Sequence, residues 1–251
     1  MDCKFKDTCK NYNTDTCNNL CYPYVFLHSK QGNKGLYGST GVPARYKDCL
    51  MNTLPIEADN PAVYKVIKKY VSDFDKYINK GVGLFLFSIP NADNKFGTGT
   101  GKTTTAITLI NEYTLYKARE HLKGRLVIKN NPALFIKASD MQNAYNGQFR
   151  GTFETQQENS SRFYDLKKKM KTVDMLVIDD IGIRNITEAF ENELYEIIDY
   201  RVTQGLVTIY TSNIPLIELI SSLGDRIVSR IDGSTYALGM AGADHRKGGL
   251  F

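Results

Sequence analysis

The sequence lacks a hydrophobic run long enough to cross a membrane. A transmembrane helix needs about 20 consecutive apolar residues, and no stretch of this chain approaches that length. The first residues, Met1-Asp2-Cys3-Lys4, also lack the apolar core of a secretory signal peptide. We therefore expect a cytoplasmic protein without a membrane partner.

The sequence also lacks internal repeats and a strong charge bias. Its 251 residues carry a formal net charge of +5, and 42% of them are hydrophobic. This length accommodates one α/β core and a small appendage. The mild positive charge permits contact with nucleic acid but does not indicate it by itself.

Cysteine is absent after Cys49, and the other four cysteines lie within the first 21 residues. In a reducing compartment this clustering favours a metal site, although free thiols or an oxidised pair are alternatives. Four thiolates this close in sequence can bind one tetrahedral Zn²⁺, and His28 could replace one of them. The predicted zinc ligands are Cys3, Cys9, Cys17 and Cys21.

A glycine-rich loop at residues 96–103 is the strongest indication of function. It follows the apolar run Leu84–Phe87 and precedes a stretch with helical spacing of apolar residues. Strand, glycine-rich loop, Gly-Lys-Thr and helix is the order of a phosphate-binding loop, whose backbone N–H groups turn toward an anion. Lys102 would reach the β- and γ-phosphates, and the Thr103 hydroxyl would bind Mg²⁺. The predicted nucleotide-binding residues of the loop are Gly97, Thr98, Gly99, Thr100, Gly101, Lys102, Thr103 and Thr104.

One position of the loop departs from the usual pattern, because Phe96 stands where the first glycine is expected. Either Gly97 makes the turn instead, or the loop is lengthened at its entry, residues 89–95. We expect the lengthened entry, with nucleotide binding kept.

Alternating strand and helix patterns predict a parallel sheet with crossover helices, hence an α/β sandwich. We expect a cysteine-rich segment at 1–35, a linker at 36–59 and the ATPase domain at 60–251. Asn60 would cap a helix that begins at Pro61. The polar stretch 150–162 is predicted to be a mobile loop. The other expected strands are 126–129, 133–137, 174–180 and 206–211, and the other expected helices lie near 139–145, 167–171 and 187–204.

Two carboxylates, Asp179 and Asp180, follow a run of four apolar residues. Ligands of open α/β sheets bind at the carboxyl ends of the strands, which is where this pattern puts both acids. Asp179 would hold Mg²⁺, and Asp180 would orient or deprotonate an attacking water. Asn213 ends the next core strand, where its amide could bind the γ-phosphate or that water. With the phosphate loop, the acids predict ATP hydrolysis; alone they would be solvated loop residues.

The order of these motifs resembles the AAA+ ATPases, and within them the DnaC/DnaI-type replicative helicase loaders and the related IstB-like ATP-binding proteins. The resemblance covers roughly residues 43–251 and implies a three-layer α/β/α sandwich that binds ATP and Mg²⁺. The segments that carry it are 99–103, 176–182, 198–201, 208–213 and 224–231, with a lead-in at 42–46.

The resemblance also implies roles for three arginines. Arg230 is similar in position to the arginine finger that enters a neighbouring subunit's site, with Arg226 as the runner-up. Arg246 looks like the sensor-2 arginine that contacts the nucleotide. The implied catalytic set is Lys102, Asp179, Asp180, Asn213 and Arg230. Asp180 replaces the usual glutamate, and its shorter side chain makes it a less secure general base.

The function implied is that of a DNA replication helicase loader, which binds a replicative helicase and single-stranded DNA. It would assemble as a homo-oligomer or on the helicase ring, with residues 1–35 as the docking segment. The alternatives are an IstB-like transposition helper and an ATP-dependent adaptor with vestigial hydrolysis.

In this family single-stranded DNA binds in the window that corresponds to residues 139–171. Its basic and aromatic residues suit DNA, although a solvated helix face explains the lysines equally well. The predicted contacts are Phe149, Arg150, Lys167, Lys168 and Lys169.

Overall fold

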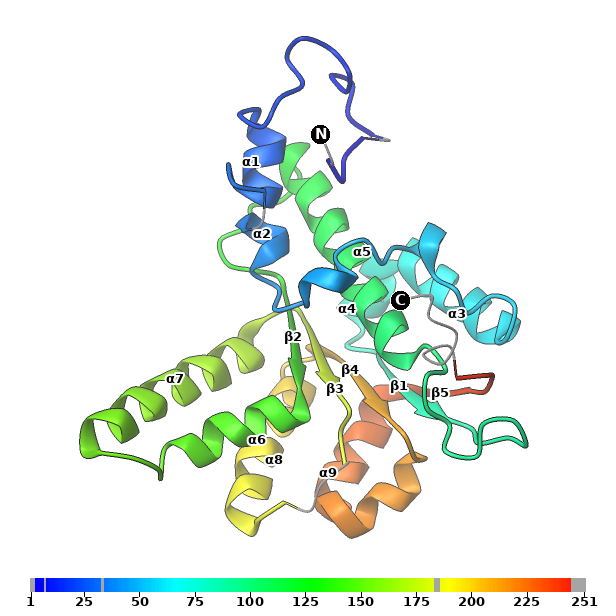
Figure 1. Ribbon diagram of the computed structural model, residues 1–251, viewed down its shortest axis with the longest axis vertical. Coiled ribbons are helices and arrows are strands. Elements are labelled where there is room, and N and C mark those ends of the chain that lie inside the picture. Colours follow the sequence, from blue (N-terminus) through cyan, green and yellow to red (C-terminus); the bar gives the residue numbers. More distant parts are fainter. Residues whose placement is uncertain (1–2, 7, 33, 183–185, 245–251) are drawn as a thin grey trace.

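A five-stranded parallel sheet forms the centre of the computed structural model, which describes residues 3–6, 8–32, 34–182 and 186–244. The strand order is β2-β3-β4-β1-β5 (Figure 1). Helical crossovers cover both faces of such a sheet, which explains why the strands are almost continuously apolar. The predicted α/β/α sandwich is confirmed. The strands are β1 (Gly83–Ser88), β2 (Ala133–Lys137), β3 (Met175–Asp179), β4 (Val207–Ser212) and β5 (Thr235–Met240).

Alternate strand residues point into two separate cores. Leu84 and Ile209 face one layer of helices, whereas Phe85 and Tyr210 face the other. The first layer consists of α3 (Pro61–Ser72), α4 (Phe74–Asn79) and α5 (Lys102–Leu122). The second consists of α6 (Ala138–Gly147), α7 (Phe153–Thr172), α8 (Glu188–Thr203), η3 (Leu216–Leu219) and α9 (Ile220–Ser234).

The cysteine-rich segment packs against the far end of α5. Figure 1 shows α1 (Tyr22–His28) and α2 (Gly35–Gly38) beside the carboxyl-terminal end of α5. Leu27, and Tyr37 from the following segment, are buried with Leu115 and Ala118 of that helix in a small third core. The expected linker is ordered here, and Thr40 O accepts a hydrogen bond from the β2 edge. The other elements of this part are η1 (Ala44–Tyr46) and η2 (Met51–Thr53).

Several expected elements differ from the structure. Residues 126–129 form no strand, because Val127 is 74% exposed and the backbone of residue 40 already lies along the edge of β2. Residues 153–162 are the first half of α7 rather than a mobile loop. Thr152 caps that helix. Helices α6 and α7 project together from the body as a hairpin (Figure 1). Most of the surface of α7 therefore faces solvent, which is why its sequence is polar on most sides. β5 was not expected, and Asn60 makes no capping bond.

No helix among the described residues has the length and apolar character needed to span a bilayer.

Candidate functional site

The glycine-rich loop joins β1 to α5 and turns at Gly97. This residue has φ +59°, and a Cβ there would lie 2.5 Å from the Cβ of Ser88. Its N–H donates to Asn94 O at 3.1 Å, so the turn is closed at the end of the 89–95 entry. Phe96 is 82% exposed and takes no part in the turn. Gly97 therefore makes the turn that the first glycine usually makes.

Lys102 is buried beneath the loop. Its ammonium donates to Ser88 Oγ at 2.5 Å and to Gly97 O at 3.3 Å. The Thr100 hydroxyl of the same loop is buried and has no hydrogen-bond partner among the described residues. Gly101, with φ +91°, precedes the first turn of α5. A buried ammonium, an unused hydroxyl and a helix N-terminus together fit the phosphate oxygens of a nucleotide.

Asp179 ends β3 directly beside the first turn of α5. Its Oδ1 accepts hydrogen bonds from Thr103 Oγ1 at 2.8 Å and from Thr211 Oγ1 at 2.7 Å. The side chain is 1% exposed, and this burial, with the nearby Asp180, raises the pKa of the Asp179 carboxyl. A hydroxyl and a carboxylate brought together here are suitable ligands for Mg²⁺.

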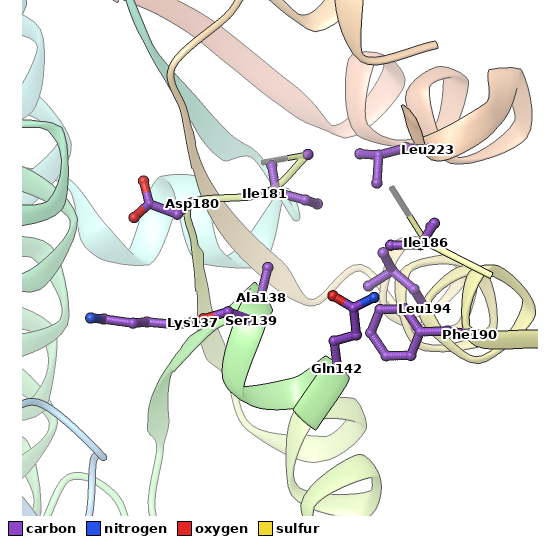
Figure 2. Close-up of a pocket in the computed structure, with 11 residues that line it drawn as sticks. Lys137, Ala138, Ser139, Gln142, Asp180, Ile181, Ile186, Phe190, Leu194 and Leu223 are labelled. Carbon is purple, nitrogen blue, oxygen red and sulfur yellow. The ribbon is translucent and has the colours of Figure 1, made fainter. Parts of the chain in front are cut away.

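Asp180 occupies the corner after β3, with φ +58°. Its N–H donates to Thr211 Oγ1 at 2.8 Å, so the hydroxyl that binds Asp179 also fixes the backbone of Asp180. Asp180 lines two neighbouring cavities. The smaller, of about 180 Å³, is shown in Figure 2, where Asp180 and Lys137 lie on one side and the apolar side chains of Ile186, Phe190 and Leu194 on the other.

The larger cavity, of about 370 Å³, joins the phosphate loop to the segment before α3. On one side it is lined by residues 99–104 and Asp180. Facing them are residues that the sequence did not single out for binding: Arg45, Tyr46, Cys49, Pro55 and Ile56. The Arg45 guanidinium lies 4.4 Å from the centre of the Tyr46 ring. This side offers flat, apolar and cationic surfaces to a ligand that occupies the loop.

Arg230 lies on α9 and lines neither cavity. Its Nη2 forms an ion pair with Asp199 Oδ1 of α8 at 2.8 Å, and its side chain is 45% exposed. Arg226, one turn earlier, stacks on the ring of Tyr195 at 4.0 Å. The structure therefore does not bring Arg230 to the loop of its own chain.

Asn213 follows β4, only two residues after Thr211, and is half-buried without lining either cavity. Its assigned role stays a prediction. Arg246 lies outside the described residues.

The predicted DNA contacts separate into two groups. Phe149 (66% exposed) and Arg150 lie at the turn between α6 and α7, and Lys168 and Lys169 are exposed on α7. Lys167 instead donates to Glu193 and Glu196 of α8 at 2.6 and 2.5 Å and is buried. Its ammonium forms ion pairs that connect α7 to α8.

The four N-terminal cysteines line one small cavity of about 40 Å³. Burial, together with the charges of the other three thiols, raises the pKa of Cys3. His28 lies in a different cavity. Nevertheless, no group of three or more His, Cys, Asp or Glu side chains in the described part of the chain is arranged to hold a metal ion. The zinc prediction gains no support from this geometry.

Sequence reasoning missed two residues that shape the site, Ser88 and Thr211, and a buried arginine at the opposite end of the sheet, Arg201. Ser88 and Thr211 bind Lys102 and Asp179, yet a hydroxyl at the end of a strand carries no distinctive pattern. Arg201 is 1% exposed and fixes the α7–β3 and α8–β4 connections. Its guanidinium donates to the carbonyls of Met170, Val173, Asp174 and Val207 and to Thr208 Oγ1.

Comparison with known proteins finds a consistent set of similar proteins. Residues 148–231 match the family model described as IstB-like ATP binding protein. The protein "Replicative helicase loader DnaC" of Buchnera aphidicola subsp. Acyrthosiphon pisum is 26% identical over 195 residues, 77% of this chain and 67% of that protein. The Escherichia coli K12 protein of the same name is 23% identical over 197 residues, 78% and 67% of the two chains.

Solved structures show the same fold. A crystal structure of the DnaC helicase loader superposes with TM-score 0.56 and 22% identity over 79% of this chain and 99% of that chain. A structure of DnaI gives TM-score 0.57 and 18% identity, covering 79% and 94%. The replication initiator DnaA bound to AMPPCP and single-stranded DNA gives 0.54 and 19%, covering 79% and 50%. The chain is thus similar to proteins named as DnaC helicase loaders and, over residues 148–231, to IstB-like ATP binding proteins, and it shares the fold of DnaC, DnaI and DnaA.

Proposed function

We propose that this protein loads a replicative DNA helicase and couples that step to binding and hydrolysis of ATP. The observation that carries the proposal is the contact of Thr103 with Asp179 beside the buried Lys102. That arrangement suits a Mg²⁺–triphosphate. The loader role rests on the relatives named helicase loaders, which align with 77% of the chain. The transposition-helper alternative is not favoured, because those relatives are named as loaders.

Thr103 and Asp179 would hold Mg²⁺, which neutralises charge on the phosphates when bound. Asp180 is the proposed general base, since its backbone is fixed by Thr211 at the mouth of the cavity. Asn213 would orient the attacking water. In this proposal the adenine base lies against Arg45 and Tyr46, which face the phosphate loop across the cavity.

Hydrolysis would require a second subunit. Arg230 is half-exposed and outside its own chain's cavities, which supports a role at a neighbour's nucleotide in a homo-oligomer or on the helicase ring. Single-stranded DNA would bind the exposed Phe149, Arg150, Lys168 and Lys169, and we leave the ion-paired Lys167 out of that set. The cysteine-rich segment would contact the helicase in the cytoplasm. Zinc binding by its four cysteines rests on their spacing in the sequence alone, since the described residues form no group arranged to hold a metal ion.

The test uses the full chain, the replicative helicase encoded in the same genome and circular single-stranded DNA. Lys102→Ala should lose ATP binding, hydrolysis and helicase loading, since it removes the buried ammonium. Lys80→Ala, at an exposed lysine, is the matched control. Loading is read by electron microscopy of helicase rings on the circles. Undiminished ATP binding by the Lys102 variant would refute the site, and failure of the wild-type chain to bind helicase would refute the loader role.

A further inference from the structure

The chain returns to the phosphate loop after its last strand. Ala241 is held on both sides by the buried Asn60, whose Nδ2 donates to Ala241 O at 2.7 Å and whose Oδ1 accepts from Ala241 N at 2.9 Å. Asn94 Nδ2, at the entry of the loop, donates to Gly242 O at 3.1 Å. Two buried asparagines thus fix residues 241–242 across the end of the loop.

This path sets the Asp244 carboxylate against the loop itself. Asp244 Oδ2 accepts a hydrogen bond from Thr98 Oγ1 at 3.1 Å. A Cβ built on Gly99 would lie 1.9 Å from Asp244 Oδ1, so the carboxylate rests directly on the backbone of that glycine. Gly99 has φ +68°, as expected in a loop that turns its N–H groups toward an anion. The negative group beside the loop therefore comes from the protein's own C-terminal segment.

We propose that the Asp244 carboxylate competes with the nucleotide's phosphates for the loop and lowers the affinity for ATP. The inference rests on the nucleotide binding proposed above for the same loop. Gly242, with φ +128°, has the backbone freedom to serve as the pivot once its carbonyl leaves Asn94 Nδ2. Residues 243–244 can then move away while Ala241 stays bound to Asn60. By linkage, a bound triphosphate disfavours the contact of Asp244 with the loop by the same factor by which that contact lowers the affinity for the triphosphate.

The charge of the ligand gives the proposal a distinct signature. Two like unit charges about 4 Å apart repel enough to change an equilibrium roughly fivefold, even at the dielectric constant of water. The repulsion grows with the charge on the phosphates and is absent for a neutral nucleoside. Removing the Asp244 charge should therefore raise the affinity for ATP most, raise that for ADP less and leave that for adenosine unchanged.

The experiment compares the full chain with Asp244→Asn and with Asp232→Asn, which removes the same charge at an exposed position of α9. Dissociation constants are measured by competition of ATP, ADP and adenosine against a fluorescent mant-ATP. We expect Asp244→Asn to bind ATP at least fivefold more tightly, with a smaller gain for ADP, and Asp232→Asn to match the wild type. In the wild type, AMPPCP but not adenosine should speed hydrogen exchange of the amides of residues 243–244.

ATP binding by a folded Asp244→Asn that is equal to or weaker than that of the wild type would overturn the inference while leaving the nucleotide site intact. If the binding is weaker, Asp244 is a ligand of the nucleotide or of its metal. An equal gain for adenosine would also overturn the inference. If neither protein binds any nucleotide, the proposed function fails and this inference fails with it. If Asp244→Asn does not fold, the exchange measurement on the wild type decides.

Discussion

Replacing Asp179 with asparagine should stabilise the nucleotide-free protein while removing its use of Mg²⁺. The asparagine has nearly the same shape, and its Oδ1 can still accept hydrogen bonds from Thr103 and Thr211. What disappears is the negative charge, which in the native protein is 1% exposed and lies beside Asp180. The two effects separate the stability of the site from its function.

The size of the gain follows from opposing terms. Burying a carboxylate costs several kcal/mol, and hydrogen bonds to a charged acceptor return about 1.5–3 kcal/mol each, compared with about 1 kcal/mol for a neutral one. Asp179 has two such bonds, so most but not all of the burial cost is offset. We expect Asp179→Asn to gain about 1 kcal/mol, equivalent to about 2–4 °C in melting temperature for a chain of this size.

The gain should depend on pH with a definite sign. Burial raises the pKa of Asp179 in the folded protein above its unfolded value, so the folded chain binds this proton more tightly. The destabilisation is complete above the folded pKa and disappears as the pH falls toward the unfolded value of about 4. The variant's advantage should therefore be largest at neutral pH and shrink on acidification.

Urea unfolding followed by circular dichroism, without nucleotide, measures this advantage, and Asp232→Asn is the control for loss of one charge. Binding of mant-ATP with Mg²⁺ or with EDTA measures the functional loss, since only the wild type should bind more tightly with Mg²⁺. A variant that is less stable than the wild type at pH 7, or an advantage that does not change with pH, would refute the reasoning.

Three further predictions concern the rest of the chain. Arg201→Met leaves buried carbonyls without donors and should lose about 2–4 kcal/mol in urea unfolding, whereas the exposed Arg125→Met should lose less than about 1 kcal/mol. Arg150→Ala should weaken binding of a fluorescent single-stranded oligonucleotide several-fold, while Lys167→Ala should lower stability and leave that affinity unchanged; the reverse pattern would contradict the assignment. Elemental analysis of the purified protein tests the zinc prediction made from the cysteine spacing: about one zinc per chain would support it, and less than half an equivalent would exclude the metal site.

The loop, both carboxylates and the parallel α/β core could be predicted from sequence, because each has a local pattern with one physical meaning. Glycines before Lys102 and apolar residues before Asp179 require no knowledge of distant contacts. The same holds for the parallel sheet, since alternation of strands and helices permits few other arrangements.

The remaining features depend on contacts between distant segments, which no local pattern encodes. Residues 150–162 were expected to be a loop because their polarity suits solvent, and a helix that projects into solvent has the same composition. In the sequence, Lys167 cannot be distinguished from the exposed lysines that follow it. Only the position of α8 in the fold shows that two glutamates pair with it. The edge strand β5 and the return of Asp244 to the loop likewise follow from how the chain's end packs.

Three side chains around the phosphate loop are already hydrogen-bonded within the chain. The ammonium of Lys102 bonds to Ser88, Asp179 accepts two threonine hydroxyls, and Asp244 bonds to Thr98. A triphosphate must therefore replace existing interactions, so its measured affinity is the difference between two bonded states. Binding at 100 times the dissociation constant still stabilises the folded chain by about 2.7 kcal/mol. Because Asp244 must move for this to happen, nucleotide binding in this proposal changes both the stability of the folded chain and the position of residues 243–244.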